Sequence, residues 1–263
     1  MTRITPTALV GGAILSLGAA AASATAETSV TVTIENLAPA NGNWLTPVWG
    51  GFHDGGFDLF DSGAAASAGL ERLAEDGNAM VLRDAFGAAN PGGTDGMIGG
   101  GPIAPGTIVS QTFTVAELNR YFSYASMVLP SNDAFVGNEN GTDVEIFDAD
   151  GTFVGADFFL TGQNVWDAGT EVNDELPENT AFFGQAAPDT GTPEGSTVGL
   201  HPGFLGSLGN PGTPSILADP QFSGADFTIP GYPIARITIV PAPGAIALLG
   251  LAGLAGTGRR RRG

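Results

Sequence analysis

The most regular pattern along the chain is an alternation of apolar and polar residues. Val30, Val32 and Ile34 are separated by polar residues, a period of two that is typical of a strand with one buried face. Residues 107–115 are rich in β-branched side chains, and residues 121–129 form a longer apolar run that suits a strand buried on both faces. The pattern therefore predicts strands in all three places.

Two further strand signals follow later in the chain. Residues 144–147 and 153–154 flank the turn sequence Asp148-Ala149-Asp150-Gly151, which predicts a hairpin. Apolar positions between 234 and 239 predict a last strand.

Helical spacing is clear in one segment only, residues 68–76. Leu70 and Leu73 fall on one face of this segment, Ser67 can cap its start, and Gly77 can end it. Many strands with almost no helix predict an all-β fold, an antiparallel β-sandwich.

Two Gly- and Pro-rich stretches, 88–105 and 187–214, are expected to be long loops within this one domain.

The first 26 residues have the layout of a secretory signal peptide. Arg3 supplies the positive start, residues 8–22 are an apolar run, and Ala24-Thr25-Ala26 fits the small-x-small cleavage rule. An uncleaved membrane anchor is the alternative interpretation. We expect cleavage, because the apolar run is short and ends in this motif.

The last 23 residues, 241–263, also have a three-part layout. Pro241-Ala242-Pro243 precedes an apolar stretch at 245–256, and four arginines follow at 259–262. This layout resembles a PEP-CTERM sorting signal, with Ala242 in place of the usual Glu. The resemblance implies transient anchoring in the inner membrane of a Gram-negative bacterium, cutting by an exosortase, and a secreted or cell-surface product. A weak membrane tail anchor is the alternative.

The net negative charge of the chain limits the kinds of molecule that it can bind. The whole chain carries a formal charge of −18, but residues 27–240 hold all 27 acidic residues and only four arginines, a formal charge of −23. Such a surface repels nucleic acid, so we expect no nucleic-acid partner. The absence of cysteine excludes disulfides, thiol nucleophiles and Cys-type zinc sites.

Carboxylates are the abundant reactive groups. Asp133 follows the apolar run 121–129, and Asp167 and Glu171 flank Gly169, whose freedom permits a tight reversal. Carboxylates and loop carbonyls are the ligands that Ca²⁺ prefers. On spacing alone, solvated loop acids remain the simpler interpretation.

Three blocks of sequence resemble the spondin-N domain. They are residues 45–77, which include the sequence HDGGFDLF; residues 125–137, ASMVLPSNDAFVG; and residues 166–171, WDAGTE. The resemblance covers about 29–239. It implies an antiparallel β-sandwich of the spondin-N type, with long Gly/Pro-rich loops and one or two short helices.

The same resemblance implies a loop-bound Ca²⁺ held by Asp133, Asp167 and Glu171. Two departures stand out at this site. Asn132 and Ala134 flank the first aspartate where the family often has Pro and Trp, and Glu171 stands where Asp is common.

We therefore expect a non-enzymatic, calcium-binding, secreted domain that acts in adhesion at the cell surface or in the matrix. Exopolysaccharide or another surface protein is the expected partner. One alternative is a carbohydrate-binding module whose exposed aromatics, among Trp44, Trp49 and Trp166, stack on sugars. A glycoside hydrolase with paired carboxylates is less favoured, because no catalytic motif accompanies the acids.

Overall fold

The computed structural model describes residues 26–204 and 216–243. The predicted signal peptide (1–26) and sorting tail (241–263) therefore lie almost wholly outside the described residues, and both remain predictions. Among the described residues, no helix is long and apolar enough to cross a membrane.

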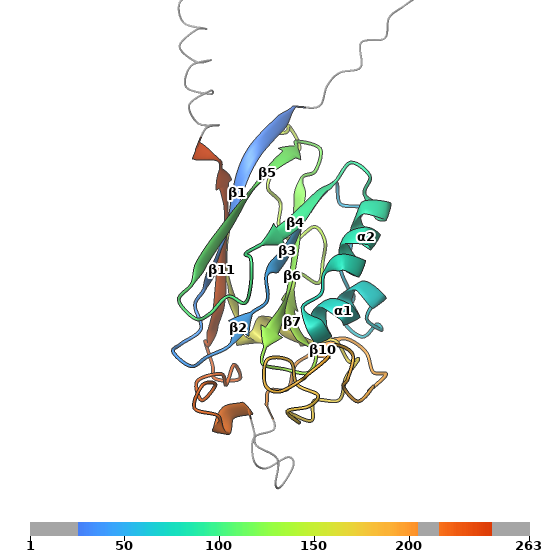
Figure 1. Cartoon of the computed structure of the whole chain (residues 1–263). Helices are drawn as coiled ribbons and strands as arrows, with labels where there is room; N and C mark the ends of the chain where they lie inside the picture. The colour runs from blue at the N-terminus through green and yellow to red at the C-terminus, as the bar shows by residue number, and fades with distance from the viewer. Residues whose placement is uncertain (1–25, 205–215, 244–263) are drawn as a thin grey trace, which may run out of the picture.

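The first of two sheets has four antiparallel strands in the order β5-β1-β11-β8 (Figure 1). These strands are β1 (Glu27–Asn36), β5 (Ile108–Ala116), β8 (Ala156–Thr161) and β11 (Pro233–Pro241). Val30, Val32 and Ile34 of β1 are fully buried, as their period of two predicts. The first and last strands of the domain thus lie side by side as the two inner strands of this sheet.

The second sheet has the order β10-β9-β7-β6-β3-β4, and the short β2 also pairs with β6. Its strands are β2 (Trp44–Leu45), β3 (Val48–His53), β4 (Thr94–Ile98), β6 (Tyr121–Leu129), β7 (Ala134–Gly137), β9 (Val165–Asp167) and β10 (Gly199–Leu200). Strand β6 is buried along nearly its whole length, as its continuous apolar run predicts.

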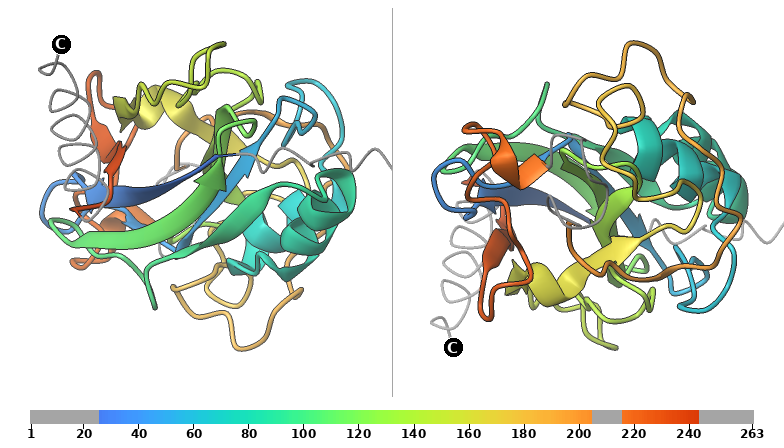
Figure 2. Two further views of the ribbon diagram at one scale, coloured as in Figure 1. Left: turned by 90° about the horizontal axis from the view of Figure 1, so that it is seen from above. Right: turned by 90° about the horizontal axis from the view of Figure 1, so that it is seen from below.

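The two sheets face each other across the main core (Figures 1 and 2). Val32 and Ile237 from the first sheet belong to the same buried cluster as Phe52 and Phe122 from the second. The fold is therefore the all-β antiparallel sandwich that the sequence predicted.

Two helices pack against the outer face of the second sheet (Figure 1), α1 (Ala68–Asp76) and α2 (Met80–Ala89). Leu70, Leu73 and Phe86 join Trp49 and Phe135 in a second buried cluster between the helices and the sheet. Because apolar side chains cover both of its faces, the second sheet is the centre of the molecule. Two short 3₁₀ turns, Gly162–Asn164 and Ile216–Ala218, lie in the later loops.

Helix α1 has the predicted bounds, with the Ser67 hydroxyl accepting from the Leu70 N–H at 3.2 Å and Gly77 left-handed at its end. Helix α2 was not predicted. Its N-terminal flanking residue, Ala79, has no side chain that can cap a helix, and Gly87 interrupts its pattern.

Two other sequence predictions need correction. The stretch 88–105 was expected to be a loop, but it contains strand β4. The expected hairpin at 144–154 forms only an isolated bridge between Phe147 and Phe153 around a tight turn. In this turn the Asp148 carboxylate accepts the N–H groups of Asp150 and Thr152, and this local bonding takes the place of a longer ladder.

The close packing of α1 against α2 can be tested by replacing a glycine of each helix with alanine. A Cβ at Gly69 of α1 would lie 2.8 Å from the Leu82 backbone of α2, whereas a Cβ at Gly87 would meet nothing within 4 Å. We expect Gly69→Ala to lower the free energy of unfolding by about 1–3 kcal/mol. The matched change Gly87→Ala should raise it by up to about 1 kcal/mol. Urea denaturation measures both, and equal effects would contradict the packing described.

Candidate metal centre

Sheet register brings Asp133 and Asp167 to the same end of the second sheet. Asp133 directly precedes β7, Asp167 ends β9, and the antiparallel pairing sets Ala134 opposite Asp167. The Ala168 N–H also donates to the carbonyl of Asp133 at 3.2 Å. Residues far apart in the sequence are therefore adjacent because their strands pair.

The turn after Asp167 requires a glycine. Gly169 has a φ of +68°, and a Cβ there would lie 2.8 Å from the carbonyl oxygen of Thr197. The Asp167 Oδ1 atom accepts the Gly169 N–H at 2.7 Å and so fixes the start of the turn. The chain then reverses tightly, as the glycine between the two acids predicted, and this places Thr170 and Glu171 over Asp133.

The Asp133 carboxylate anchors this turn and is itself fully buried. Its Oδ2 atom accepts three hydrogen bonds, from the Thr170 N–H at 2.8 Å, the Thr170 hydroxyl at 3.2 Å and the Glu171 N–H at 3.0 Å. Its Oδ1 atom is buried and has no hydrogen-bond partner among the described residues. A buried carboxylate oxygen without a partner is costly, and such an atom points to a missing ligand.

Negative charge accumulates around this atom. Burial, and then the nearby Asp167 carboxylate, raise the pKa of Asp133 to about 7. Burial also raises the pKa of Asp167. No arginine contributes to either shift, so the two acids face each other without a balancing cation.

Glu171, the third predicted ligand, lies near Asp133 and near helix α1, and its Oε2 atom is also buried without a hydrogen-bond partner among the described residues. Its side chain is 3% exposed, and its Oε1 atom accepts the Gly191 N–H at 2.9 Å. Burial, and then the neighbouring Glu75 carboxylate, raise the pKa of Glu171 to about 8. Arg72 of α1 lowers this pKa and also pairs with Glu75 at 3.2 Å. Glu171 thus lies between the Asp133 site and helix α1, and its role as a ligand stays a prediction.

The donor set fits a hard cation in part. Asp133 and Asp167 offer carboxylate oxygens and no nitrogen or sulfur, which suits Ca²⁺. Among the described residues, however, no group of three or more His, Cys, Asp or Glu side chains is arranged to hold a metal ion. The structure brings Asp133 and Asp167 together and leaves Glu171 as a prediction, so a bound Ca²⁺ would need neutral oxygens as further ligands.

Two residues that support Asp167 were missed in the sequence. The Asn173 side-chain amide donates to Asp167 Oδ2 at 2.5 Å, and its Oδ1 atom lies 3.1 Å from His201 Nε2. His201 Nδ1 accepts the Gly203 N–H, so the ring proton lies on Nε2 and is donated to Asn173. Burial lowers the pKa of His201 to about 4, which keeps the ring neutral. No spacing rule joins a histidine to an asparagine 28 positions earlier.

The three tryptophans do not form the shared aromatic platform that the alternative of a carbohydrate-binding module requires. Trp49 is fully buried beneath α2, where its ring meets the ring of Phe86 at 5.4 Å between centroids. Trp44 and Trp166 are each half-buried, and they pack against Phe182 and Phe60, respectively. Core packing therefore accounts for Trp49 and for part of the other two rings.

These raised pKa values generate a test of pH dependence. The folded protein binds protons more tightly than the unfolded chain between about pH 4 and the folded pKa values of about 7 and about 8. In EDTA, the free energy of unfolding should therefore fall as the pH rises through this window. One pKa unit corresponds to about 1.4 kcal/mol, so we expect a fall of a few kcal/mol.

The matched variant is Asp133→Asn, whose amide oxygen can still accept the hydrogen bonds from Thr170 and Glu171. Its stability should depend less steeply on pH in urea denaturation from pH 5 to pH 8. A wild-type protein that becomes more stable across this range would contradict the assignment.

Comparison with models of known protein families gives a match that includes this turn. The family model described as Spondin_N matches residues 36–176, more than half of the chain, and this range includes Asp133, Asp167 and Glu171. No individually curated protein matches the sequence. The chain therefore belongs to the spondin-N family.

Proposed function

We propose that this protein is an extracellular spondin-type domain that binds Ca²⁺ at the loops beside β7 and β9 and acts in adhesion. One observation carries the metal assignment: the fully buried Asp133 carboxylate keeps an oxygen atom without a partner and faces a second carboxylate, Asp167. Family membership supports the extracellular, spondin-like role.

In this proposal Asp133 and Asp167 hold the cation with their carboxylate oxygens. When bound, Ca²⁺ supplies positive charge and takes six to eight oxygen ligands. Asp133 has a second task, because its other oxygen fixes the turn at Thr170 and Glu171. The hydrogen bond from the Asn173 amide to Asp167 Oδ2 leaves the aspartate side chain less freedom to rotate.

A rigid turn would extend order to the neighbouring loop. The Thr170 carbonyl accepts the Glu194 N–H at 2.8 Å, and the Gly169 carbonyl accepts the Ser196 N–H at 2.8 Å. Holding the turn in place therefore also holds residues 192–197, which form part of the same end of the sandwich. This end is the surface that we propose for adhesion.

The proposed role in adhesion depends on the strong negative charge of the domain as well as on the rigid loops. Residues 27–240 carry a formal charge of −23, so an anionic exopolysaccharide is repelled unless a cation lies between. A divalent cation at the loops lowers the local negative charge and permits contact with such a polymer or with another acidic surface protein. The predicted sorting tail, with exosortase processing, agrees with this location but remains a prediction.

Thermal unfolding of the purified full-length protein tests the metal site. We expect Ca²⁺, but not Mg²⁺, to raise the free energy of unfolding over EDTA, by about 2.7 kcal/mol at a hundred times the Kd. Asp167→Asn should remove most of the rise. The control is Asp148→Asn, because Asp148 also accepts two backbone N–H groups in a tight turn but lies away from Asp133.

The proposal of a metal site is wrong if Ca²⁺ has no selective effect, or if Asp167→Asn responds like the control. Adhesion is a separate step, read from retention of the protein on an alginate matrix. If the Asp167→Asn variant is retained in Ca²⁺ as well as the wild type is, the proposed role of this site is contradicted. Ca²⁺ bound to the alginate itself would then account for the retention.

A further inference from the structure

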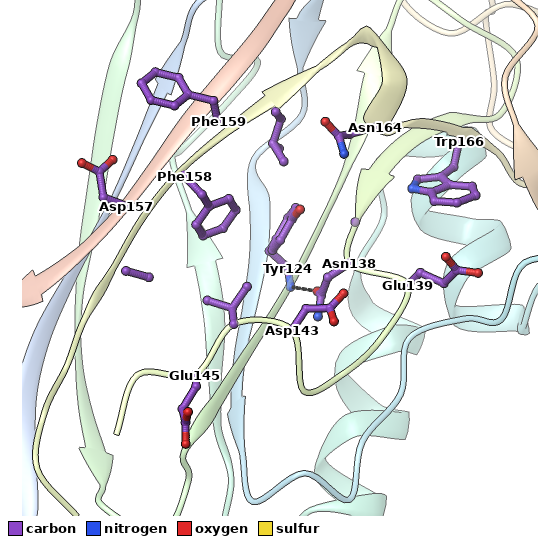
Figure 3. Close-up of a pocket in the computed structure, with 14 residues that line it drawn as sticks. Tyr124, Asn138, Glu139, Asp143, Glu145, Asp157, Phe158, Phe159, Asn164 and Trp166 are labelled. Carbon is purple, nitrogen blue, oxygen red and sulfur yellow. Dashed lines mark hydrogen bonds between the residues drawn. The ribbon is translucent and has the colours of Figure 1, made fainter. Parts of the chain in front are cut away.

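A pocket separate from the metal centre opens between strand β8 and the loop that follows β7 (Figure 3). Its volume is about 520 Å³, within the range of small-ligand sites. Neither Asp133 nor Asp167 lines it, and its walls come from both sheets. Strand β8 is an edge strand, paired only with β11, so the sandwich is open along this side.

Aromatic rings form the deeper wall of this pocket. Tyr124 of β6 and Phe158 of β8 lie with ring centroids 5.6 Å apart, and Trp166 of β9 lines the far end (Figure 3). Tyr124 is only 5% exposed, yet its hydroxyl forms no hydrogen bond with any described residue. A polar atom that lines a pocket and lacks a partner is a site for a ligand to bind.

Four carboxylates lie around the mouth of the pocket, and two of them are paired with arginines. Asp157 is paired with Arg236, with 2.7 Å from Nε to Oδ1 and 2.6 Å from Nη2 to Oδ2, and Glu145 is paired with Arg120.

Glu139 and Asp143 have no arginine partner among the described residues. Within residues 26–204 and 216–243, Glu139 accepts only the Ser62 N–H, at 3.2 Å, and the exposed Asp143 carboxylate accepts no hydrogen bond. Figure 3 shows Asp143 below Tyr124 and Glu139 below Trp166. No basic side chain of the part of the chain that the structure describes lines the pocket.

We propose that this pocket binds a small organic cation, an ammonium group on a short apolar stem. Aromatic faces attract a cation through the ring quadrupole, and quaternary ammonium groups are the ligands that aromatic walls recognise best. The free carboxylates of Asp143 and Glu139 add opposite charge at the mouth, and the Tyr124 hydroxyl supplies one polar contact deeper inside. The net negative charge of the domain draws cations towards it.

The residues that line the pocket fit an organic cation better than a divalent metal ion or a neutral sugar. A divalent metal ion binds several oxygen atoms at short distance, whereas rings and aliphatic groups such as those of Phe158, Val144 and Leu160 form much of this wall. A neutral sugar has no charge to balance Asp143 and Glu139. Both remain measurable as competing outcomes.

Isothermal titration of the full-length protein in EDTA, at low salt, tests the proposal with choline as the probe. We expect saturable binding with a Kd of roughly a millimolar, the range for so small a ligand. The neutral isostere 3,3-dimethylbutan-1-ol has the same shape without the charge, and it should bind at least about tenfold more weakly. Added salt should weaken choline binding.

Variants locate the binding in this pocket. Asp143→Asn should weaken choline binding several-fold, because it removes one of the two free charges. Asp150→Asn makes the same change of charge at an exposed turn outside the pocket and should have no comparable effect. Asp167→Asn should also leave choline binding intact, which separates this site from the proposed calcium site.

Four results would overturn the proposal. They are the absence of saturable binding up to about 20 mM choline, equal binding of the neutral isostere, equal losses in Asp143→Asn and Asp150→Asn, and tighter binding of the neutral disaccharide maltose than of choline.

Discussion

The attachment of the 167–171 turn to Asp133 is the contact on which the functional end of this domain depends. One carboxylate oxygen of Asp133 accepts both backbone and hydroxyl donors from the turn, and the side chain is fully buried. Backbone hydrogen bonds also join this turn to residues 192–197. A single buried anion therefore organises two loops that the strands themselves do not hold.

Burying the Asp133 carboxylate beside Asp167 is electrostatically unfavourable, because no cationic side chain balances the two negative charges. Asp133 and Asp167 lie together without an arginine, whereas Glu171 and Glu75 share Arg72. The carboxylates nearest the sheet are thus the ones left unbalanced, and an external cation resolves the conflict between burial and charge. The pocket beside β8 has the same imbalance in a milder, exposed form, at Asp143 and Glu139.

Sequence patterns predicted the elements whose signal is local. Strand β6 and helix α1 have the expected bounds, because a continuous apolar run and a capped helix each carry their own evidence. Helix α2 and strand β4 were missed, since α2 lacks a capping side chain and β4 contains Thr94, Asp95 and Gly96. Their stability comes from packing and pairing that no short window contains.

The same limit applies to the site. The spacing around Gly169 predicted the tight turn, and the family resemblance grouped this turn with Asp133. Neither predicted that Glu171 accepts from Gly191 and lies near helix α1. Nor could it predict that Asn173 links Asp167 to a neutral His201. These contacts depend on loops that approach one another only in the folded chain.

The most direct test of the central claim is a crystal structure grown in Ca²⁺, with anomalous scattering used to locate the ion. The account predicts a peak in contact with the Asp133 Oδ1 atom and the Asp167 carboxylate, with neutral oxygens completing the shell. A peak between Glu171 and Glu75 instead, or no peak at a Ca²⁺ concentration that saturates the thermal shift, would contradict it.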